Sequence, residues 1–293
     1  MPFLPKRVQL AIRFRQINGA APDLRNPRLL SERIVHRTLT DRAPLLRTFC
    51  DKVAAKEWIA TRIGAGRTPR TLAIADSVEA LQAHPLPDRW MLKASHGSGW
   101  YQLVDASTHP LDEPVLAQAR RWLGMDYADV FQEWGYRNLP RRRLAEEFLS
   151  CAGRQCIEMS AFCFKGRVRG LRLFRPESAH VRHRGEQRHL PRTKECFLDE
   201  ALQPLPLECP QHDHCREFAS LDRTPLQTFC ALARDLSDET SFLRVDSFLS
   251  DRGVLVGNSP PIRGPACCCG CPGRGMPGSG TSGPERPPDG RPA

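Results

Sequence analysis

The chain has 293 residues, of which 40% are hydrophobic and 26% are charged, proportions that are ordinary for a soluble globular protein. No apolar run approaches the roughly 20 residues that a membrane-spanning helix needs, and the N-terminal stretch lacks a secretory cleavage site, so we expect no membrane span and a cytoplasmic location. The net charge of +10 favours anionic partners, but the basic residues are spread along the chain without interleaved aromatic residues, which argues against nucleic acid.

Residues 26 to 64 are predicted to be helical. Asn26 and Pro27 are typical of a helix start, Leu46 and Phe49 continue a helical hydrophobic spacing, and Gly64 is placed to end the second helix. We therefore predict an N-terminal helical segment over residues 1–66.

Short strands and helices are predicted to alternate after this segment. Polar or glycine turns bound strand candidates at residues 71–75, 90–94, 101–105, 143–149, 159–165, 168–174, 243–249 and 253–256. Residues 76–79 are typical of a capping box at a helix start, and helical patterning covers residues 113–123 and 225–236. Turns at Lys165-Gly166 and at Asp251-Arg252-Gly253 predict hairpins, so the sheets should be largely antiparallel and the fold class α+β.

The remaining segments set the predicted domain boundaries. Residues 67–142 and 143–258 are expected to form two α+β subdomains, with residues 176–224 as a long surface excursion. Residues 259–293 are dominated by Pro, Gly and Cys and are predicted to be a disordered tail. The twelve cysteines are irregularly spaced and no export signal is present, so we expect free thiols and no disulfide-linked partner.

The segment from Trp90 to Trp100 carries the clearest chemical signal. A short apolar strand delivers Lys93 to a turn formed by His96, Gly97, Ser98 and Gly99. Glycines allow a ligand to approach the backbone closely, and consecutive N–H groups can form an anion-binding nest beside the lysine charge. This combination suits a polyphosphate, although a hairpin turn with a solvated lysine is the simpler alternative.

The order of the elements resembles the TupA-like ATP-grasp family of cell-surface polysaccharide biosynthesis from about Asn26 to Gly257. Six segments carry the resemblance, in this order: NPRLLSERI, DRAPLLRTFCDKVAAKEWIATRIG, PDRWMLKASHGSG, LAEEFL, SAFCFKGRVRGLRLF and FLRVDSFLSDRGVLVG. The resemblance implies an ATP-grasp fold, in which two α+β subdomains with largely antiparallel sheets hold ATP between them, with ATP and Mg²⁺ as cofactors.

The same resemblance implies roles for two lysines. Lys93 would hold the ATP phosphates and take part in catalysis, under the turn formed by residues 96–99. Lys52 matches a family lysine and would be a further phosphate contact, whereas the alternative is an exposed helix residue paired with Asp51 or Glu57.

Two adjacent glutamates are implied to bind the nucleoside. Glu146 and Glu147 lie at the end of a strand that joins the two halves, where the family binds adenine and ribose. Since neighbouring strand residues point to opposite faces, only one glutamate is expected to face the cleft. The other is expected to pair with an arginine of residues 141–143.

Asp246 matches the family's metal-binding acid, and a carboxylate on an apolar strand is costly to bury unless it is paired or binds a cation. We expect Asp246 to be a catalytic Mg²⁺ ligand and consider pairing with Arg244, two residues away, to be poor geometry. Asn258 stands where the family has its second acidic ligand and brings no charge. Ser160 stands where many relatives have a lysine.

The chain departs from the family pattern after Gly257. The family continues with Gly-Glu-Leu-Thr, whereas this chain continues with Asn258, Ser259 and two prolines. Free codon choice in the frame one base upstream permits ELTTHSGAGLLLRLSG over residues 257–273. We therefore hypothesise a one-base shift near codon 257, or a truncation of the family pattern, and sequencing the locus tests this.

The leading functional hypothesis is an ATP-dependent carboxylate-amine ligase that attaches an amino acid to a polysaccharide or its sugar precursor. Because the second acidic ligand is missing, we expect weak ATP binding and low or absent turnover. A non-catalytic basic protein that binds nucleic acid or an anionic glycan is the main alternative, and a kinase or glycosyltransferase acting on the same polymer is another.

Overall fold

The computed structural model describes residues 4–176, 193–206, 213–214, 218 and 221–257. Among these, residues 4–40 belong to one compact unit and residues 41–257 to another. The first unit contains α1 (Lys6–Asn18) and α2 (Leu30–Thr40), which share a small core of Leu10, Phe14 and Val35.

The second unit begins with α3 (Pro44–Cys50) and α4 (Lys52–Ile63), which fall within the region predicted to be helical. Pro44 stands at the start of α3, where its missing N–H leaves no hydrogen bond unmade. Asp51 separates the two helices and caps α4, since its carboxylate accepts a hydrogen bond from the backbone N–H of Val53 at 3.0 Å.

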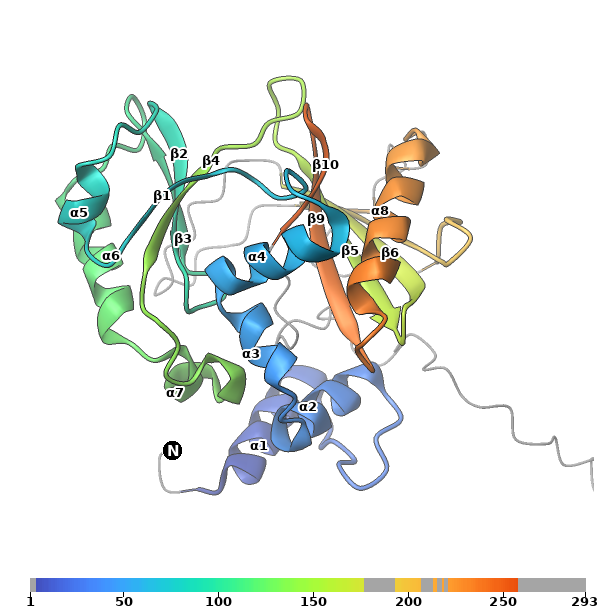
Figure 1. Cartoon of the computed structure of the whole chain (residues 1–293). Coiled ribbons are helices and arrows are strands. Elements are labelled where there is room, and N and C mark those ends of the chain that lie inside the picture. Colours follow the sequence, from blue (N-terminus) through green and yellow to red (C-terminus); the bar gives the residue numbers. More distant parts are fainter. Residues whose placement is uncertain (1–3, 177–192, 207–212, 215–217, 219–220, 258–293) are drawn as a thin grey trace, which may run out of the picture. The chain divides into compact units, whose positions relative to one another are not determined.

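A four-stranded antiparallel sheet follows, in the order β1-β4-β2-β3 (Figure 1). Its strands are β1 (Thr71–Ala75), β2 (Arg89–Ala94), β3 (Tyr101–Asp105) and β4 (Arg143–Glu147). The helices α5 (Val78–Gln82), α6 (Glu113–Gly124) and α7 (Tyr127–Phe131) and the short helix η1 (Trp134–Tyr136) belong to the same part of the chain. Strand β4, which begins the predicted second subdomain, is hydrogen-bonded inside this first sheet.

A second sheet has six strands in the order β10-β9-β5-β6-β7-β8. Its strands are β5 (Ile157–Phe164), β6 (Arg167–Pro176), β7 (Thr193–Leu198), β8 (Asp213–His214), β9 (Leu243–Ser250) and β10 (Gly253–Val256). All pairs are antiparallel except β7 with β8. The predicted α+β class with largely antiparallel sheets after N-terminal helices is confirmed.

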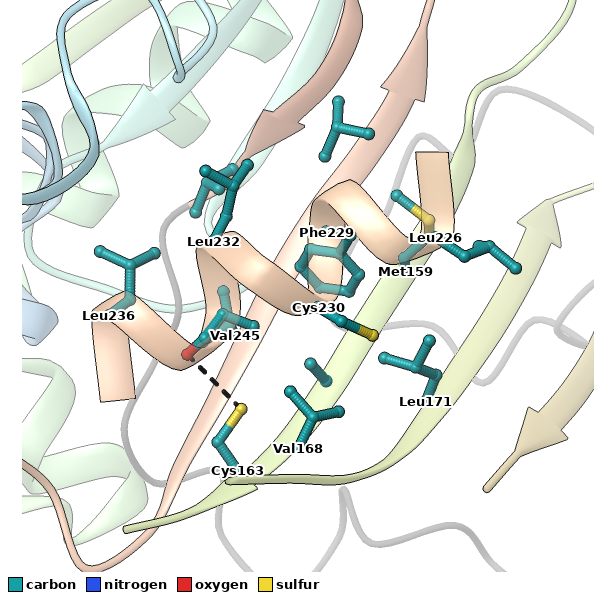
Figure 2. Close-up of a cluster of buried hydrophobic side chains, with 14 of the residues drawn as sticks. Met159, Cys163, Val168, Leu171, Leu226, Phe229, Cys230, Leu232, Leu236 and Val245 are labelled. Carbon is teal, nitrogen blue, oxygen red and sulfur yellow. Dashed lines mark hydrogen bonds between the residues drawn. The ribbon is translucent and has the colours of Figure 1, made fainter. Parts of the chain in front are cut away.

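The helix α8 (Arg223–Ser237) covers one face of the six-stranded sheet. Figure 2 shows Phe229, Leu226 and Leu236 of this helix beside Met159 and Val245 of the strands. Every second side chain of β5 is buried in this core. Such alternation of buried and less buried residues is the pattern of a strand with one face on a core.

The prediction that residues 176–224 form a surface excursion is wrong in part. β7 lies inside that segment, and Cys196, Phe197 and Leu198 are buried. The charged residues Lys194 and Glu195 made this segment unlike a strand in the sequence. Glu195 is buried in an ion pair with Arg172 of β6. Most of the rest of that segment, and the predicted tail at residues 259–293, lie outside the described residues.

The helices and the cysteines bear on two further predictions. None of the helices in the described part of the chain is long and apolar enough to cross a membrane. The six cysteines whose surroundings are described are free thiols, namely Cys50, Cys151, Cys156, Cys163, Cys196 and Cys230.

Candidate functional site

A cavity of about 250 Å³ brings the predicted site residues together in the second unit. Its lining comes from α4, from strands of both sheets and from the glycine turn after β2. Of the predicted site residues, the lining includes Lys52, Lys93, Gly97, Ser98, Gly99, Glu146, Glu147 and Asp246. Residues from separate segments of the sequence therefore share one site.

Lys93 belongs to a charge cluster centred on the buried Glu146. Its Nζ is 2.5 Å from Glu146 Oε2, and Lys56 Nζ on α4 is 3.0 Å from Glu146 Oε1. Glu146 stands on β4 diagonally across from Lys93 on β2, so the sheet register itself brings the two side chains together. One carboxylate is thus shared by two ammonium groups.

The electrostatics of this cluster keep Glu146 ionised. Burial raises the pKa of Glu146, but the charges and hydrogen bonds of Lys93 and Lys56 outweigh burial and hold that pKa below its ordinary value. Burial and the charge of Lys93 lower the pKa of Lys56, and Glu146 opposes them only in part. An anion entering the cavity would therefore meet two ammonium groups that share a single negative charge.

The glycine turn is shaped by Trp100. A Cβ on Gly97 would lie 2.4 Å from Cε3 of the buried Trp100 ring, so the ring allows no side chain there. Gly99 has φ of 72°, in the left-handed region that favours glycine, with open space around it. Gly97, Ser98 and Gly99 all line the cavity, as an anion-binding turn requires.

His96 has a different environment from its neighbours in the turn. Its ring is buried, its Nε2 lies 2.8 Å from the carbonyl oxygen of Trp122, and it packs edge-on against Trp100. The cavity lining does not include it. Burial lowers the pKa of His96, so the neutral ring is favoured. A nucleotide contact by His96 stays a prediction without support from its position.

Lys52 is half-buried and faces the glycine turn. Its Nζ donates hydrogen bonds to the carbonyl oxygens of Ala94, at 2.5 Å, and Gly97. The sequence left open that Lys52 pairs on the surface with Asp51 or Glu57. This arrangement is not observed, since Lys52 faces the turn and Asp51 caps α4 and binds Arg142 at 2.8 Å.

Glu147 ends β4 and is held by two arginines. Its carboxylate accepts hydrogen bonds from the backbone N–H of Arg70 at 2.7 Å and from the side chains of Arg70 and Arg252. One glutamate was expected to pair with an arginine of residues 141–143. Glu147 does pair with arginines, but these are Arg70 and Arg252. Arg143, for example, is buried and donates to the carbonyl oxygens of Asp76 and Ala119.

Both glutamates line the cavity, although only one was expected to face it. The register between β1 and β4 shifts beside Glu146, between Thr71 and Ala73, and Glu147 is the last residue of β4. The strict alternation of faces assumed from the sequence therefore does not extend to this strand end.

Asp246 on β9 is held by two partners. Arg244 donates to it through Nε at 2.7 Å and through Nη2 at 2.5 Å, and Ser160 Oγ donates at 2.8 Å. The expectation that pairing with Arg244 is poor geometry is wrong, because residues two apart share a strand face and the long arginine side chain reaches along the strand to Asp246. Ser160 lies directly opposite Asp246 on β5.

The fit of a magnesium ion to these residues is incomplete. Within the described ranges, no group of three or more His, Cys, Asp or Glu side chains could hold a metal ion. Asp246 already binds a guanidinium group, and Asn258, the predicted second ligand, lies outside the described residues.

The fit of a nucleotide is better. Lys56, Lys93 and the glycine turn offer positive charge and N–H donors, as polyphosphate binding requires. The same cavity has apolar lining that could cover a base, namely Met91, Leu103, Phe148, Leu149, Met159 and Phe248.

The sequence predictions missed three cationic residues of the cavity: Lys56, Arg172 and Arg244. Lys56 had a signal, because it lies four residues after Lys52 and thus on the same face of α4. Arg172 had none in its local sequence, since its place in the cavity depends on the pairing of β6 with β5.

Comparisons with solved structures find distant likenesses. D-alanine–D-alanine ligase from Bacillus anthracis is 13% identical with a TM-score of 0.37, over 83% of this chain and 62% of that one. VanG D-Ala:D-Ser ligase from Enterococcus faecalis is 11% identical with a TM-score of 0.46, over 76% of this chain and 55% of that one. L-amino acid ligase from Bacillus licheniformis is 12% identical with a TM-score of 0.41, over 73% and 41%. The chain therefore spans less than two thirds of the length of each.

Comparison of the sequence with curated proteins and with models of protein families identifies the family of the chain. A search of curated proteins finds no significant match. The model of one protein family, described as TupA-like ATPgrasp, matches residues 32–266, which is well over half of the chain and includes every residue of the cavity described above. This chain belongs to the TupA-like ATP-grasp family.

Proposed function

We propose that the cavity binds ATP and that the protein is an ATP-dependent carboxylate-amine ligase of cell-surface polysaccharide biosynthesis. The observation that carries the proposal is the Lys93–Glu146–Lys56 cluster beside the glycine turn. Family membership supports ATP-grasp chemistry, whereas the substrates are inferred from the charge of the chain and of the site.

Each side of the cavity has a separate role in this proposal. Lys93 and Lys56 bind the phosphates. Their ion pairs with Glu146 then weaken in part, because the phosphates compete with the carboxylate for the same two ammonium groups. The backbone N–H groups of the glycine turn bind the same phosphates. Glu147, fixed by Arg70 and Arg252, stands beside Phe148 and Leu149 where the nucleoside would lie.

Bound ATP would supply a phosphoryl group to a substrate carboxylate, giving an acyl phosphate that an amine attacks with release of phosphate. The chain's contribution is charge neutralisation and alignment, which is the main requirement of phosphoryl transfer. Lys93 is placed to neutralise charge on the transferred group. We propose that Arg172 and Arg244, which line the cavity from β6 and β9 while paired with Glu195 and Asp246, meet the anionic substrate.

The acceptor that we propose is an acidic sugar, such as a uronic acid, joined to an amino acid. The net charge of +10 favours an acidic acceptor, and a uronic acid brings the carboxylate that the reaction consumes. Turnover should be slow, because the carboxylate of Asp246 already pairs with Arg244.

Hydroxylamine trapping tests the reaction class. The protein is incubated with ATP, Mg²⁺, a uronic acid and hydroxylamine, and ATP-dependent hydroxamate is measured. We expect slow hydroxamate formation that depends on the uronic acid and falls at least about tenfold in Lys93→Met, a loss of about 1.4 kcal/mol. Binding of oligonucleotides or anionic glycans that weakens steeply with salt and ignores ATP, without any hydroxamate, would instead favour a non-catalytic binding protein.

A further inference from the structure

The first compact unit, residues 4–40, carries most of the net charge of the chain, and we call it the N-terminal unit. It contains eight basic and two acidic residues, a net charge of +6, whereas the whole chain of 293 residues has +10. Helix α1 has four of these basic residues, Lys6, Arg7, Arg13 and Arg15, and no acidic residue. Positive charge concentrated in this way favours a large anionic partner.

The two acidic side chains of the N-terminal unit are bound to backbone between α1 and α2. Asp23 Oδ1 accepts hydrogen bonds from the backbone N–H groups of Arg25 and Asn26, at 3.0 and 2.9 Å. Glu32 is buried and accepts hydrogen bonds from three backbone N–H groups of residues 23–29. Neither carboxylate belongs to α1, so the basic side chains of that helix are not interleaved with acidic ones.

Helix α1 also has apolar side chains on the side away from its core. Leu10 and Phe14 pack against Val35 of α2 (Figure 1). Val8 and Ile12 each precede one of these two α1 residues by two positions, which puts them about 200° away around the helix. Val8 is 41% exposed and Ile12, one turn further, is half-buried. Val8 therefore presents apolar surface on the side that does not pack on α2.

Exposed apolar residues are frequent in the N-terminal unit. Of the six large apolar residues that are exposed in the described part of the chain, three belong to this unit, namely Leu4, Val8 and Leu29. Leu4 lies four residues before Val8, and the exposed Arg7 and Arg28 are sequence neighbours of Val8 and Leu29. Apolar and basic side chains on one helix are typical of binding to the interface of a lipid bilayer. A hydrated acidic polymer would be attracted by the charge but would gain little from the apolar side chains.

We propose that the N-terminal unit binds an anionic membrane surface, with Leu4 and Val8 among the lipid headgroups and the basic residues of α1 beside the lipid phosphates. The two attractions have different physical origins. Salt screens the attraction between basic residues and anionic lipids, whereas burial of apolar side chains does not depend on charge. Together they bind a protein to a membrane surface more firmly than either does alone.

Sedimentation with lipid vesicles tests the proposal on the whole chain, without nucleotide. Vesicles of phosphatidylcholine with about 30% phosphatidylglycerol are compared with vesicles of phosphatidylcholine alone, and we expect binding to the anionic vesicles to be at least about tenfold tighter. Arg7→Glu, which reverses a charge of α1, and Val8→Asp, which replaces an apolar contact by an anion, should each weaken this binding at least about tenfold.

Matched controls make the same changes at exposed positions of the other unit. Arg121→Glu and Val130→Asp should bind anionic vesicles within about twofold of the wild type. Arg121→Glu changes the net charge as much as Arg7→Glu does, so an effect of total charge alone would be equal in the two. The melting temperature of each variant establishes that it is folded.

Three results would overturn the proposal. The first is equal binding of the wild type to the two kinds of vesicle, or no binding to either. The second is a folded Arg7→Glu or Val8→Asp protein that binds like its control. The third is binding of polygalacturonate, without binding to vesicles, that is lost in Arg7→Glu and kept in Val8→Asp, since this would assign the surface to an acidic glycan. Because no nucleotide is present, these results are independent of the proposed function.

Discussion

Glu146 shows how a single residue sets the charge of the site. It is 2% exposed and its two oxygens are each bound by a different ammonium group. Removing one partner of a buried ion pair leaves the other charges uncompensated, which is far more costly than losing a surface pair. The stability of the free protein and the affinity for phosphate are therefore linked at this residue.

We predict that Glu146→Gln lowers the free energy of unfolding by about 3 kcal/mol, because Lys93 and Lys56 lose their shared counter-charge. Urea denaturation measures this loss. The control is Glu113→Gln, whose pair with Arg120 is exposed and should contribute less than about 1 kcal/mol. Equal losses in the two variants would contradict a buried, functional charge cluster.

Lys52 gives the protein a defined pH dependence. Its pKa is about 7 in the folded chain and 10.5 without perturbation, so the unfolded chain binds more protons between these values. The contribution of Lys52 to the free energy of unfolding therefore rises as the pH rises from about 7 towards 10.5. We predict that the stability of the wild type relative to Lys52→Met increases between pH 7 and pH 9, roughly the accessible part of that window. A relative stability that falls over this range, measured by urea denaturation, would show that the pKa is not lowered.

At the scale of the element, two glycines of the turn differ in the room that they leave for a side chain. A methyl group at Gly97 would collide with the buried ring of Trp100, whereas a methyl group at Gly99 meets open space and costs only about 1 kcal/mol of left-handed strain. We predict that Gly97→Ala lowers the melting temperature and weakens ADP binding more than Gly99→Ala does. Calorimetric melting with and without ADP measures both effects. If Gly99→Ala has the larger effect on both, the turn does not depend on packing against Trp100.

The elements also show what the sequence could predict. β1, β3 and β10 have the predicted bounds, and β6 and β9 lie within two residues of them, because glycine and polar turns mark their ends. β7 was missed since the charge of Glu195 is compensated only across the sheet, by Arg172. Lys93 could be placed from its strand and its turn. The pairing of Arg244 with Asp246 could not, because it depends on a side-chain rotamer and on Ser160 of a different strand.

At the scale of the whole molecule, the cavity depends on the core beneath the six-stranded sheet. Phe229 of α8 is fully buried against this sheet, as Figure 2 shows, and the opposite sides of the strands β5 and β9 contribute cavity residues such as Ser160 and Asp246. We predict that Phe229→Ala lowers the free energy of unfolding by about 3–5 kcal/mol. Val130→Ala, at a position that is 43% exposed, should change it by less than about 0.5 kcal/mol. Urea denaturation distinguishes the two, and similar values would contradict this assignment of the core.

The central claim is that Lys93 and its neighbours bind the phosphates of a nucleotide. Isothermal titration of the whole chain with MgADP, in the wild type and in Lys93→Met, tests it most directly. The account predicts measurable binding by the wild type and an affinity at least about tenfold lower in the variant, which is a loss of about 1.4 kcal/mol. Equal affinities for the two proteins, or no binding by a folded wild type, would contradict it.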